Sequence, residues 1–268
     1  MLLAEIHGKV LEEAQSHEDY LTSAVFGHLR YLPPSLFWDE FFSNAKTLPL
    51  DGREKSLSQS LREQGSRVSE YSAVQIHFWP NHPKWGEPDL ALCFTGSNLR
   101  PLVVVVEVKL NSEKSGSGDE DQLVKYLGIL SDLSALHVDV PMPVNPFAAL
   151  VYLTPRESLR EIESSLASSR ATLADRQRLF RVQWQDLLAV ARRAASGADG
   201  QSKTILRDVS LFLQKRGLEY FSGFAEVPAL PIFDSNDGAF YERHGFFDGF
   251  REVAGWRPIQ IEEGGWMR

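Results

Sequence analysis

The sequence predicts an α/β fold in which a mixed β-sheet is flanked by helices and followed by a mostly helical C-terminal extension. Three observations support this class. Residues 74–78 alternate apolar and polar side chains, as a half-buried strand does. Residues 102–109 and 147–153 are mostly β-branched or apolar runs, which are typical of strands covered on both faces. Apolar residues at three- and four-residue spacing indicate helices around these strands.

Helical patterns occupy the first part of the chain. Apolar residues at helical spacing predict a helix over residues 18–32, which Pro33 and Pro34 end. A second short helix is expected around residues 36–42 and a third over residues 54–64.

The central part is expected to be a β-meander with strands at 74–78, 89–94 and 102–109. A Gly- and Ser-rich loop over 111–119 then leads to a helix over about 120–136. The remaining expected elements are a strand at 147–153, a helix over about 156–171, a strand at 179–182, and helices over 184–195 and 203–216. The polar break at 196–202 predicts a domain boundary, with one domain over residues 1–195 and an extension over 196–268 that ends in an irregular or β tail.

Composition indicates an ordinary globular protein and argues against a protein that coats nucleic acid. The 268 residues are 43% hydrophobic and 24% charged, with a net charge of −8. The longest uninterrupted apolar run, 147–153, is far below the roughly 18 residues that cross a bilayer, so no membrane span is expected. Because Cys93 is the single cysteine, no intrachain disulfide can form. A cytoplasmic location is the resulting expectation.

Positive charge is concentrated in one stretch of this acidic chain. Residues 151–216 contain 12 basic and 7 acidic residues. Such a stretch is typical either of helix faces in water or of a surface that meets phosphate. The candidate phosphate contacts are Arg170, Arg176, Arg178 and Arg181.

Three charged or polar motifs occur in a fixed order along the predicted meander and the helix after it. Pro88-Asp89 stands where a loop enters a strand, and Glu107-Val108-Lys109 ends the most β-branched strand. Strand alternation places Glu107 and Lys109 on one face, where burial is costly unless the charges are paired or bound to a metal. Gln122 and Tyr126 follow at a spacing that puts them on one helical face.

This order of motifs resembles the signature of the PD-(D/E)XK nuclease superfamily, which has the restriction-endonuclease-like fold, over about residues 18–153. The Gln122 and Tyr126 pair is similar to the QxxxY element of the RecB-type branch. The resemblance implies a Mg²⁺-dependent nuclease acting on DNA, with Mn²⁺ as a substitute ion. Carboxylates such as Asp89 and Glu107 supply the hard oxygen ligands that Mg²⁺ prefers.

The resemblance also implies roles for the neighbouring residues. The Val108 carbonyl would be a further metal ligand, and Glu18 would help to complete the metal site. Lys109 would orient or help deprotonate the attacking water and offset charge on phosphorus. Gln122 and Tyr126 would brace Lys109 or touch the substrate strand, unless Tyr126 is simply part of the core.

Two other classes of protein fit the same residues. The first is a non-catalytic nucleic-acid-binding or assembly subunit of a larger complex that keeps the fold. The second is an interaction protein in which the strand-end charges form an ion-pair network. The sequence leaves open the choice between DNA and RNA, between endo- and exonuclease, the pathway, and whether protein partners or a homo-oligomer are involved.

Overall fold

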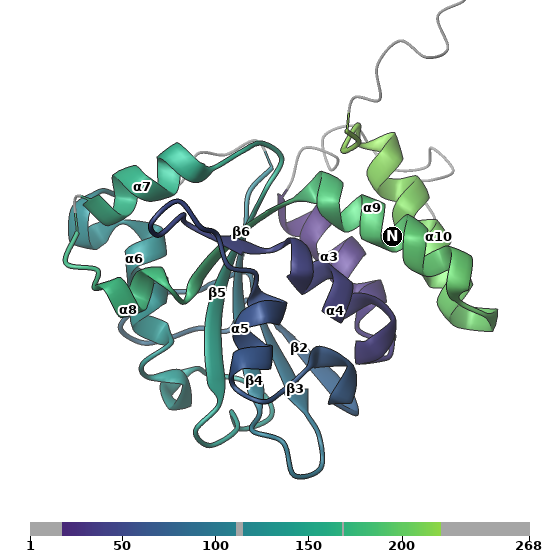
Figure 1. Cartoon of the computed structure of the whole chain (residues 1–268), viewed down its shortest axis with the longest axis horizontal. Coiled ribbons are helices and arrows are strands. Elements are labelled where there is room, and N and C mark those ends of the chain that lie inside the picture. Colours follow the sequence, from purple (N-terminus) through teal and green to yellow (C-terminus); the bar gives the residue numbers. More distant parts are fainter. Residues whose placement is uncertain (1–17, 111–114, 168, 221–268) are drawn as a thin grey trace, which may run out of the picture. The chain divides into compact units, whose positions relative to one another are not determined.

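The structure is a computed structural model that describes residues 18–110, 115–167 and 169–220. A six-stranded sheet with the order β1-β6-β5-β4-β3-β2 lies at the centre of this part of the chain (Figure 1). The strands are β1 (Lys46–Thr47), β2 (Ala73–Phe78), β3 (Leu90–Thr95), β4 (Leu102–Val108), β5 (Phe147–Thr154) and β6 (Leu179–Gln183).

The sheet is mixed, because its two halves are connected differently. β2, β3 and β4 form an antiparallel meander, while β4, β5 and β6 run parallel and β1 pairs antiparallel to β6. Parallel neighbours need a long crossover, and the chain between β4 and β5 supplies it with a helix. The carboxyl ends of β4, β5 and β6 therefore lie along one edge of the sheet.

Eight α-helices surround the sheet in the described part of the chain. They are α3 (Glu18–Leu29), α4 (Pro34–Asn44), α5 (Leu57–Glu63), α6 (Gln122–Ile129), α7 (Leu159–Ala167), α8 (Leu173–Arg176), α9 (Trp184–Gly197) and α10 (Gly200–Lys215). Single 3₁₀ turns occur at Val68–Glu70, Gly118–Glu120 and Leu133–Ala135. No helix in these ranges is both long and apolar enough to cross a membrane.

The alternation of side chains along β4 divides the interior into two cores. Val104, Val106 and Val108 face a core built with α3, α4, α5, α9 and α10. Val103 and Val105 face the other core, which α6 and α7 cover. Figure 1 shows α3, α4, α9 and α10 on one side of the sheet and α6 and α7 on the other. Because Glu107 follows Val103 and Val105 in the alternation, it points to the α6 and α7 side.

The predicted α/β class is confirmed, and the differences from the predicted elements have local causes. The helix expected over residues 120–136 ends at Ile129 and is followed by the 3₁₀ turn at Leu133–Ala135. Leu133 and Leu136 are buried in the same core as α6, so the apolar spacing continues although the helix does not. The expected helix over 156–171 is shorter, at Leu159–Ala167, and the short elements β1 and α8 carry no periodic signal.

The described part is one compact unit that continues to Tyr220, past the boundary expected between residues 195 and 196. α10 packs against α9 and α3, and its residues Leu206, Val209 and Phe212 enter the same core as α3 and α4. An apolar helix face covered in this way cannot separate from the sheet without exposing that core. The expected irregular or β tail falls at 221–268, outside the described residues.

Candidate active site

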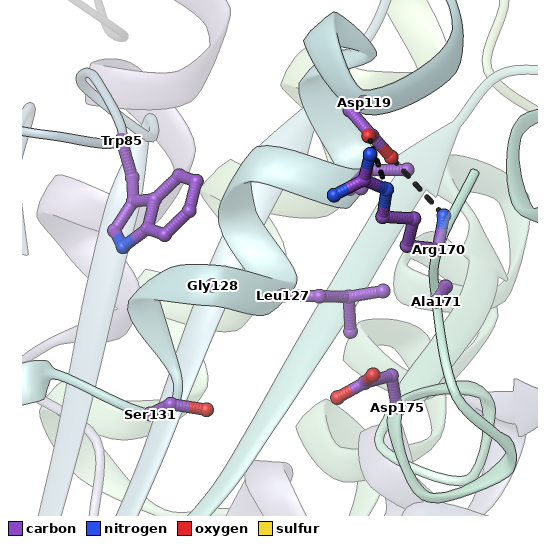
Figure 2. Close-up of a pocket in the computed structure, with 9 residues that line it drawn as sticks. Trp85, Asp119, Leu127, Gly128, Ser131, Arg170, Ala171 and Asp175 are labelled. Atoms are coloured by element: carbon purple, nitrogen blue, oxygen red, sulfur yellow. Dashed lines mark hydrogen bonds and ion pairs between the residues drawn. The ribbon is translucent and has the colours of Figure 1, made fainter.

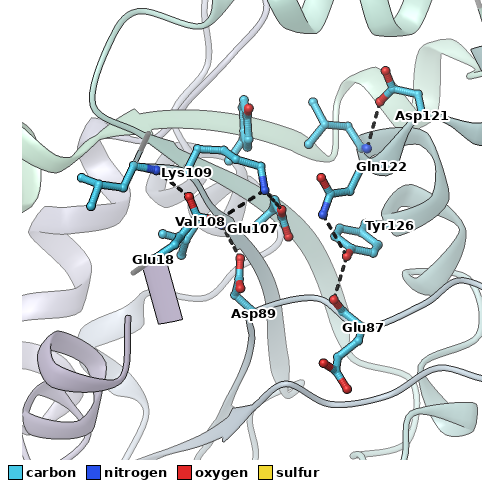
Figure 3. A network of polar contacts seen from close by, with 12 residues as sticks. Glu18, Glu87, Asp89, Glu107, Val108, Lys109, Asp121, Gln122 and Tyr126 are labelled. Atoms are coloured by element: carbon cyan, nitrogen blue, oxygen red, sulfur yellow. Dashed lines mark hydrogen bonds and ion pairs between the residues drawn. The ribbon is translucent and has the colours of Figure 1, made fainter. Parts of the chain in front are cut away.

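Asp89 and Glu107 face each other across two neighbouring strands. The antiparallel register pairs Leu90 with Val106, so the next position places Asp89 opposite Glu107. The Oδ2 atom of Asp89 accepts a hydrogen bond of 2.7 Å from the Val108 backbone N–H. Figure 3 shows both carboxyl groups beside Lys109 at the end of β4. The register of β3 and β4 thus brings together two residues that are 18 positions apart.

Lys109 lies among carboxylates. Its Nζ is 2.5 Å from Glu107 Oε1 and 3.5 Å from Glu18 Oε1, while Glu18 Oε2 accepts the Leu110 backbone N–H at 2.7 Å. Glu107 is 2% exposed and Lys109 is 8% exposed, so water screens their contact weakly. The structure therefore places Glu18, at the start of α3, in the same centre as the strand-end motif, and its expected role in a metal site stays a prediction.

The Gln122 and Tyr126 pair contacts the loop that carries Asp89. Gln122 Nε2 donates to the Tyr126 hydroxyl at 3.2 Å, and that hydroxyl donates to the Glu87 carbonyl at 2.7 Å (Figure 3). Asp121 caps α6 by accepting the Leu123 N–H at 3.0 Å, which fixes where the helix begins. In the described contacts this pair braces the loop that leads to Asp89, and the expected roles beside Lys109 or at the substrate strand stay predictions.

Burial and repulsion set the protonation of these groups. Burial raises the pKa of Asp89 to about 6, and burial together with the Asp89 carboxylate raises the pKa of Glu107 to about 9. Burial alone would lower the pKa of Lys109, but the carboxylates of Glu107 and Glu18 hold the pKa above its ordinary value. Ionising both carboxyl groups leaves more negative charge than one ammonium can offset, which favours binding of a further cation.

The carboxylate oxygens of Asp89 and Glu107 fit a hard divalent cation that takes few ligands from the protein. No three or more His, Cys, Asp and Glu side chains gather as a metal site among residues 18–110, 115–167 and 169–220. Mg²⁺ commonly takes only one or two carboxylates and completes its shell with waters and substrate phosphate. Asp89 and Glu107 meet that requirement. A ligand role for the Val108 carbonyl stays a prediction.

Two of the four candidate arginines each bind two other groups of the protein through their side chains. Arg178 donates to the Ala148 carbonyl at 3.2 Å and to the Leu130 carbonyl at 2.8 Å. Ala148 is in register with Val103, four residues or about 13 Å along β4 from Glu107. Arg181 forms ion pairs with Glu54 and Glu157. These bonds occupy part of each guanidinium, and phosphate contact by Arg178 or Arg181 stays a prediction.

Of the other two arginines, Arg170 lies beside a pocket that α6 helps to line. Arg170 is exposed and pairs with Asp119 at 3.3 Å at the rim of a pocket of about 430 Å³ (Figure 2). Trp85 packs over Gly128 in the same pocket, and a side chain at that glycine would meet the indole ring. Arg176 lies on α8. Phosphate contact by Arg170 and Arg176 stays a prediction.

Sequence reasoning missed one contact of Lys109. The indole N–H of Trp184, the first residue of α9, donates to the Lys109 carbonyl at 3.0 Å. The two residues are 75 positions apart, so neither periodicity nor motif spacing could indicate the bond.

The fold and the site define the class: an α/β protein with a mixed sheet and with acidic and basic side chains clustered at the carboxyl end of a central strand. No protein-family model matches the chain, and no curated protein sequence matches it. Among solved structures, the chain is similar to the MspJI restriction endonuclease in complex with a 27-mer oligonucleotide, at 14% identity and a TM-score of 0.26. The match covers 78% of this chain and 34% of that one, so the chain spans about a third of that protein's length. A likeness of this size carries no inference about activity.

Proposed function

We propose that the chain is a metal-dependent nuclease of the PD-(D/E)XK type that hydrolyses phosphodiester bonds of DNA. The observation that supports this proposal best is the meeting of Asp89, Glu107 and Lys109 at the end of β4, two carboxyl groups and an ammonium within one small volume. DNA is proposed because the motifs resemble those of DNA nucleases. The buried free thiol of Cys93 agrees with a reducing compartment, and we propose the cytoplasm.

The energetic argument is that stability alone does not explain these residues. Burying a carboxylate costs several kcal/mol, and a buried ion pair is often no more stable than apolar side chains of the same volume. Glu107 and Lys109 directly follow four consecutive buried valines, so apolar residues would continue the strand at lower cost. The chain retains charge where packing favours none, which is the pattern of a functional centre.

The proposed roles follow from the contacts. Asp89 and Glu107 would hold Mg²⁺ or Mn²⁺, which when bound supplies Lewis acidity and an activated water. Lys109 would present its ammonium to the scissile phosphate, offsetting the charge that develops there and orienting the attacking water. Glu18 contacts Lys109 Nζ and keeps the side chain at the end of β4. Tyr126 holds the loop that carries Asp89.

The direct test is cleavage by the full chain. Linear, circular and single-stranded DNA, and RNA, are incubated with Mg²⁺, Mn²⁺ or EDTA, and products are followed on gels. Asp89→Ala and Glu107→Ala should each lower the rate by about 10²-fold or more, because each removes a proposed ligand of the metal ion. Glu87→Ala is the matched control, since Glu87 is an exposed carboxylate two residues from Asp89.

Wild-type rates in Asp89→Ala or Glu107→Ala, at unchanged metal affinity and melting temperature, would overturn the site assignment. Cleavage of RNA alone would overturn the choice of substrate and keep the chemistry. The type of ends and the behaviour on circular DNA separate endo- from exonuclease activity.

One observation favours a second candidate, a non-catalytic nucleic-acid-binding or assembly subunit. Lys109 Nζ already lies against Glu107 Oε1, so each of these buried polar groups has a partner without a metal. This candidate predicts DNA binding or complex formation without cleavage in any metal. An ion-pair network with a purely structural role predicts neither DNA binding nor any change in melting temperature when Mg²⁺ or Mn²⁺ is added.

A further inference from the structure

The backbone of Lys109 is held from three directions just beyond the end of β4. Its N–H donates to the Leu153 carbonyl of β5 at 2.8 Å, and its carbonyl accepts the Trp184 indole N–H of α9 at 3.0 Å. The next N–H, of Leu110, donates to Glu18 of α3 at 2.7 Å. Because β4 ends at Val108, the bond from Trp184 fixes the Lys109 carbonyl where the β-ladder no longer does.

Trp184 is well placed to act as a rigid support. The side chain is fully buried, and Phe26 of α3 contacts its ring edge-on at a centroid distance of 6.2 Å. A buried indole has two side-chain torsions, and packing of this kind leaves it little freedom to move. The position of its N–H, and hence of the Lys109 carbonyl, is therefore determined by the packing of α9 against α3 and the sheet.

Trp38 offers an internal comparison. It is also fully buried in the same core, and it also contacts Phe26, at 6.3 Å. Its indole N–H has no hydrogen-bond partner among the described residues. The two tryptophans thus share size, burial and a neighbour, and differ in whether the N–H reaches the strand-end motif.

We propose that Trp184 is a positioning residue for Lys109, and that α9, which lies outside the region resembling the nuclease superfamily, supports the reaction through this one bond. The part of the proposal that concerns cleavage rests on the proposed function. Holding the carbonyl fixes the direction in which the Lys109 side chain leaves the backbone. Misplacement of a reacting group by about 1 Å can cost about 10²-fold in rate, so loss of this support should lower turnover measurably.

The test compares Trp184→Phe with Trp38→Phe in the full chain. Both changes replace a buried indole with a smaller phenyl ring in the same core and leave a similar cavity. Only Trp184→Phe removes an N–H that donates to the Lys109 carbonyl. For Trp184→Phe we expect kcat for DNA cleavage to fall about tenfold or more with little change in KM, a smaller loss than full misplacement would cause. For Trp38→Phe we do not expect a fall in kcat at constant KM, whatever the effect of the change on the melting temperature.

Hydrogen exchange supplies a readout that does not depend on cleavage. The amides of Lys109 and Leu110 should exchange faster in Trp184→Phe, because the strand end loses one of its supports, and should keep the wild-type rate in Trp38→Phe. Should Trp184→Phe fail to fold, site-specific replacement of Trp184 by benzothienylalanine removes the N–H while keeping the shape of the ring.

The two readouts separate the two proposals. Faster exchange in a protein that cleaves no nucleic acid would reject the proposed function and retain Trp184 as the support of Lys109. An active wild type with unchanged kcat and unchanged exchange in Trp184→Phe would overturn the positioning role. Equal loss of kcat in both variants would also overturn it, since cavity formation alone would then explain the effect.

Discussion

The centre around Glu107 and the arginines between residues 170 and 181 are both charged regions, yet they differ in what holds their charges. In the centre, Asp89, Glu107 and Lys109 lie at or next to the ends of two adjacent strands, whose register leaves them little choice of partner. The arginines are long side chains that reach whichever acceptor the tertiary structure offers. Arg178 reaches two backbone carbonyls and Arg181 reaches two carboxylates.

The difference teaches which kind of sequence signal is informative. Strand alternation and register act over a few ångströms and are local, so a short motif places its charges reliably. A count of basic residues says nothing about pairing, because a guanidinium has five donors and a flexible stem. Net charge along a stretch therefore indicates where cations are, and only the contacts indicate which of them remain available.

The largest expected effect concerns Lys109. Lys109→Ala should lower the cleavage rate by about 10²-fold or more, the range for positioned groups that assist proton transfer, with little change in DNA affinity. Single-turnover rates at saturating DNA measure the chemical step. Lys125→Ala is the control, since Lys125 is a partly exposed lysine of α6 paired with Glu120. If Lys109→Ala only weakens DNA binding, Lys109 is a phosphate contact.

A second prediction tests the arginine region. Arg178→Ala should destabilise the protein by about 2 kcal/mol, because it leaves the partly buried carbonyls of Ala148 and Leu130 without their charged donor. Thermal unfolding measures this loss. The slope of log DNA affinity against log salt concentration should stay as in the wild type.

Arg170 and Arg176 give the opposite prediction. Each phosphate contact contributes about 0.7 to 0.9 to the slope of log DNA affinity against log salt concentration. The double variant Arg170→Ala, Arg176→Ala should therefore lower the slope by about 1.5. Binding is measured with Ca²⁺ to limit hydrolysis. An unchanged slope would mean that these two arginines face water, and a lowered slope in Arg178→Ala would mean that Arg178 also contacts phosphate.

The smallest expected effect is on stability and its pH dependence. Because burial raises the pKa of Asp89 to about 6, the folded protein binds this proton more tightly than the unfolded chain does. Asp89 thus favours the folded state most below pH 4, and its contribution to the free energy of unfolding is lost as pH rises from about 4 to about 6. Asp89→Asn, in EDTA, should raise the melting temperature relative to wild type above pH 6, by about 2–4 °C per kcal/mol of relieved cost.

Below pH 4 the melting temperatures of Asp89→Asn and wild type should converge. The amide oxygen of Asn can still accept the Val108 N–H, so the comparison isolates charge. A difference between the two proteins that is the same at every pH would mean that ionisation of Asp89 does not strain the fold.

The sequence predicted the strands and the motif geometry well, and the reasons are physical. β-Branched runs such as residues 103–106 fix β4, and alternation then puts Glu107 on the α6 side. The end of α6 could not be predicted, because Leu133 stays buried after the helix has stopped. The partners of Arg178 and Trp184 could not be predicted either, since each bond links segments that only the complete fold brings together.

The bonds around Lys109 also have a consequence for how the protein is made. Glu18 and Leu110 are 92 positions apart, and Lys109 and Trp184 are 75 apart. Synthesis delivers the amino-terminal residues first, at about 5–20 residues per second. A nascent chain that has reached residue 130 contains every charged residue of the motif but neither β5 nor α9. Such a chain has the motif without the support of the strand end, and translation must pass Trp184 before Lys109 is held in place.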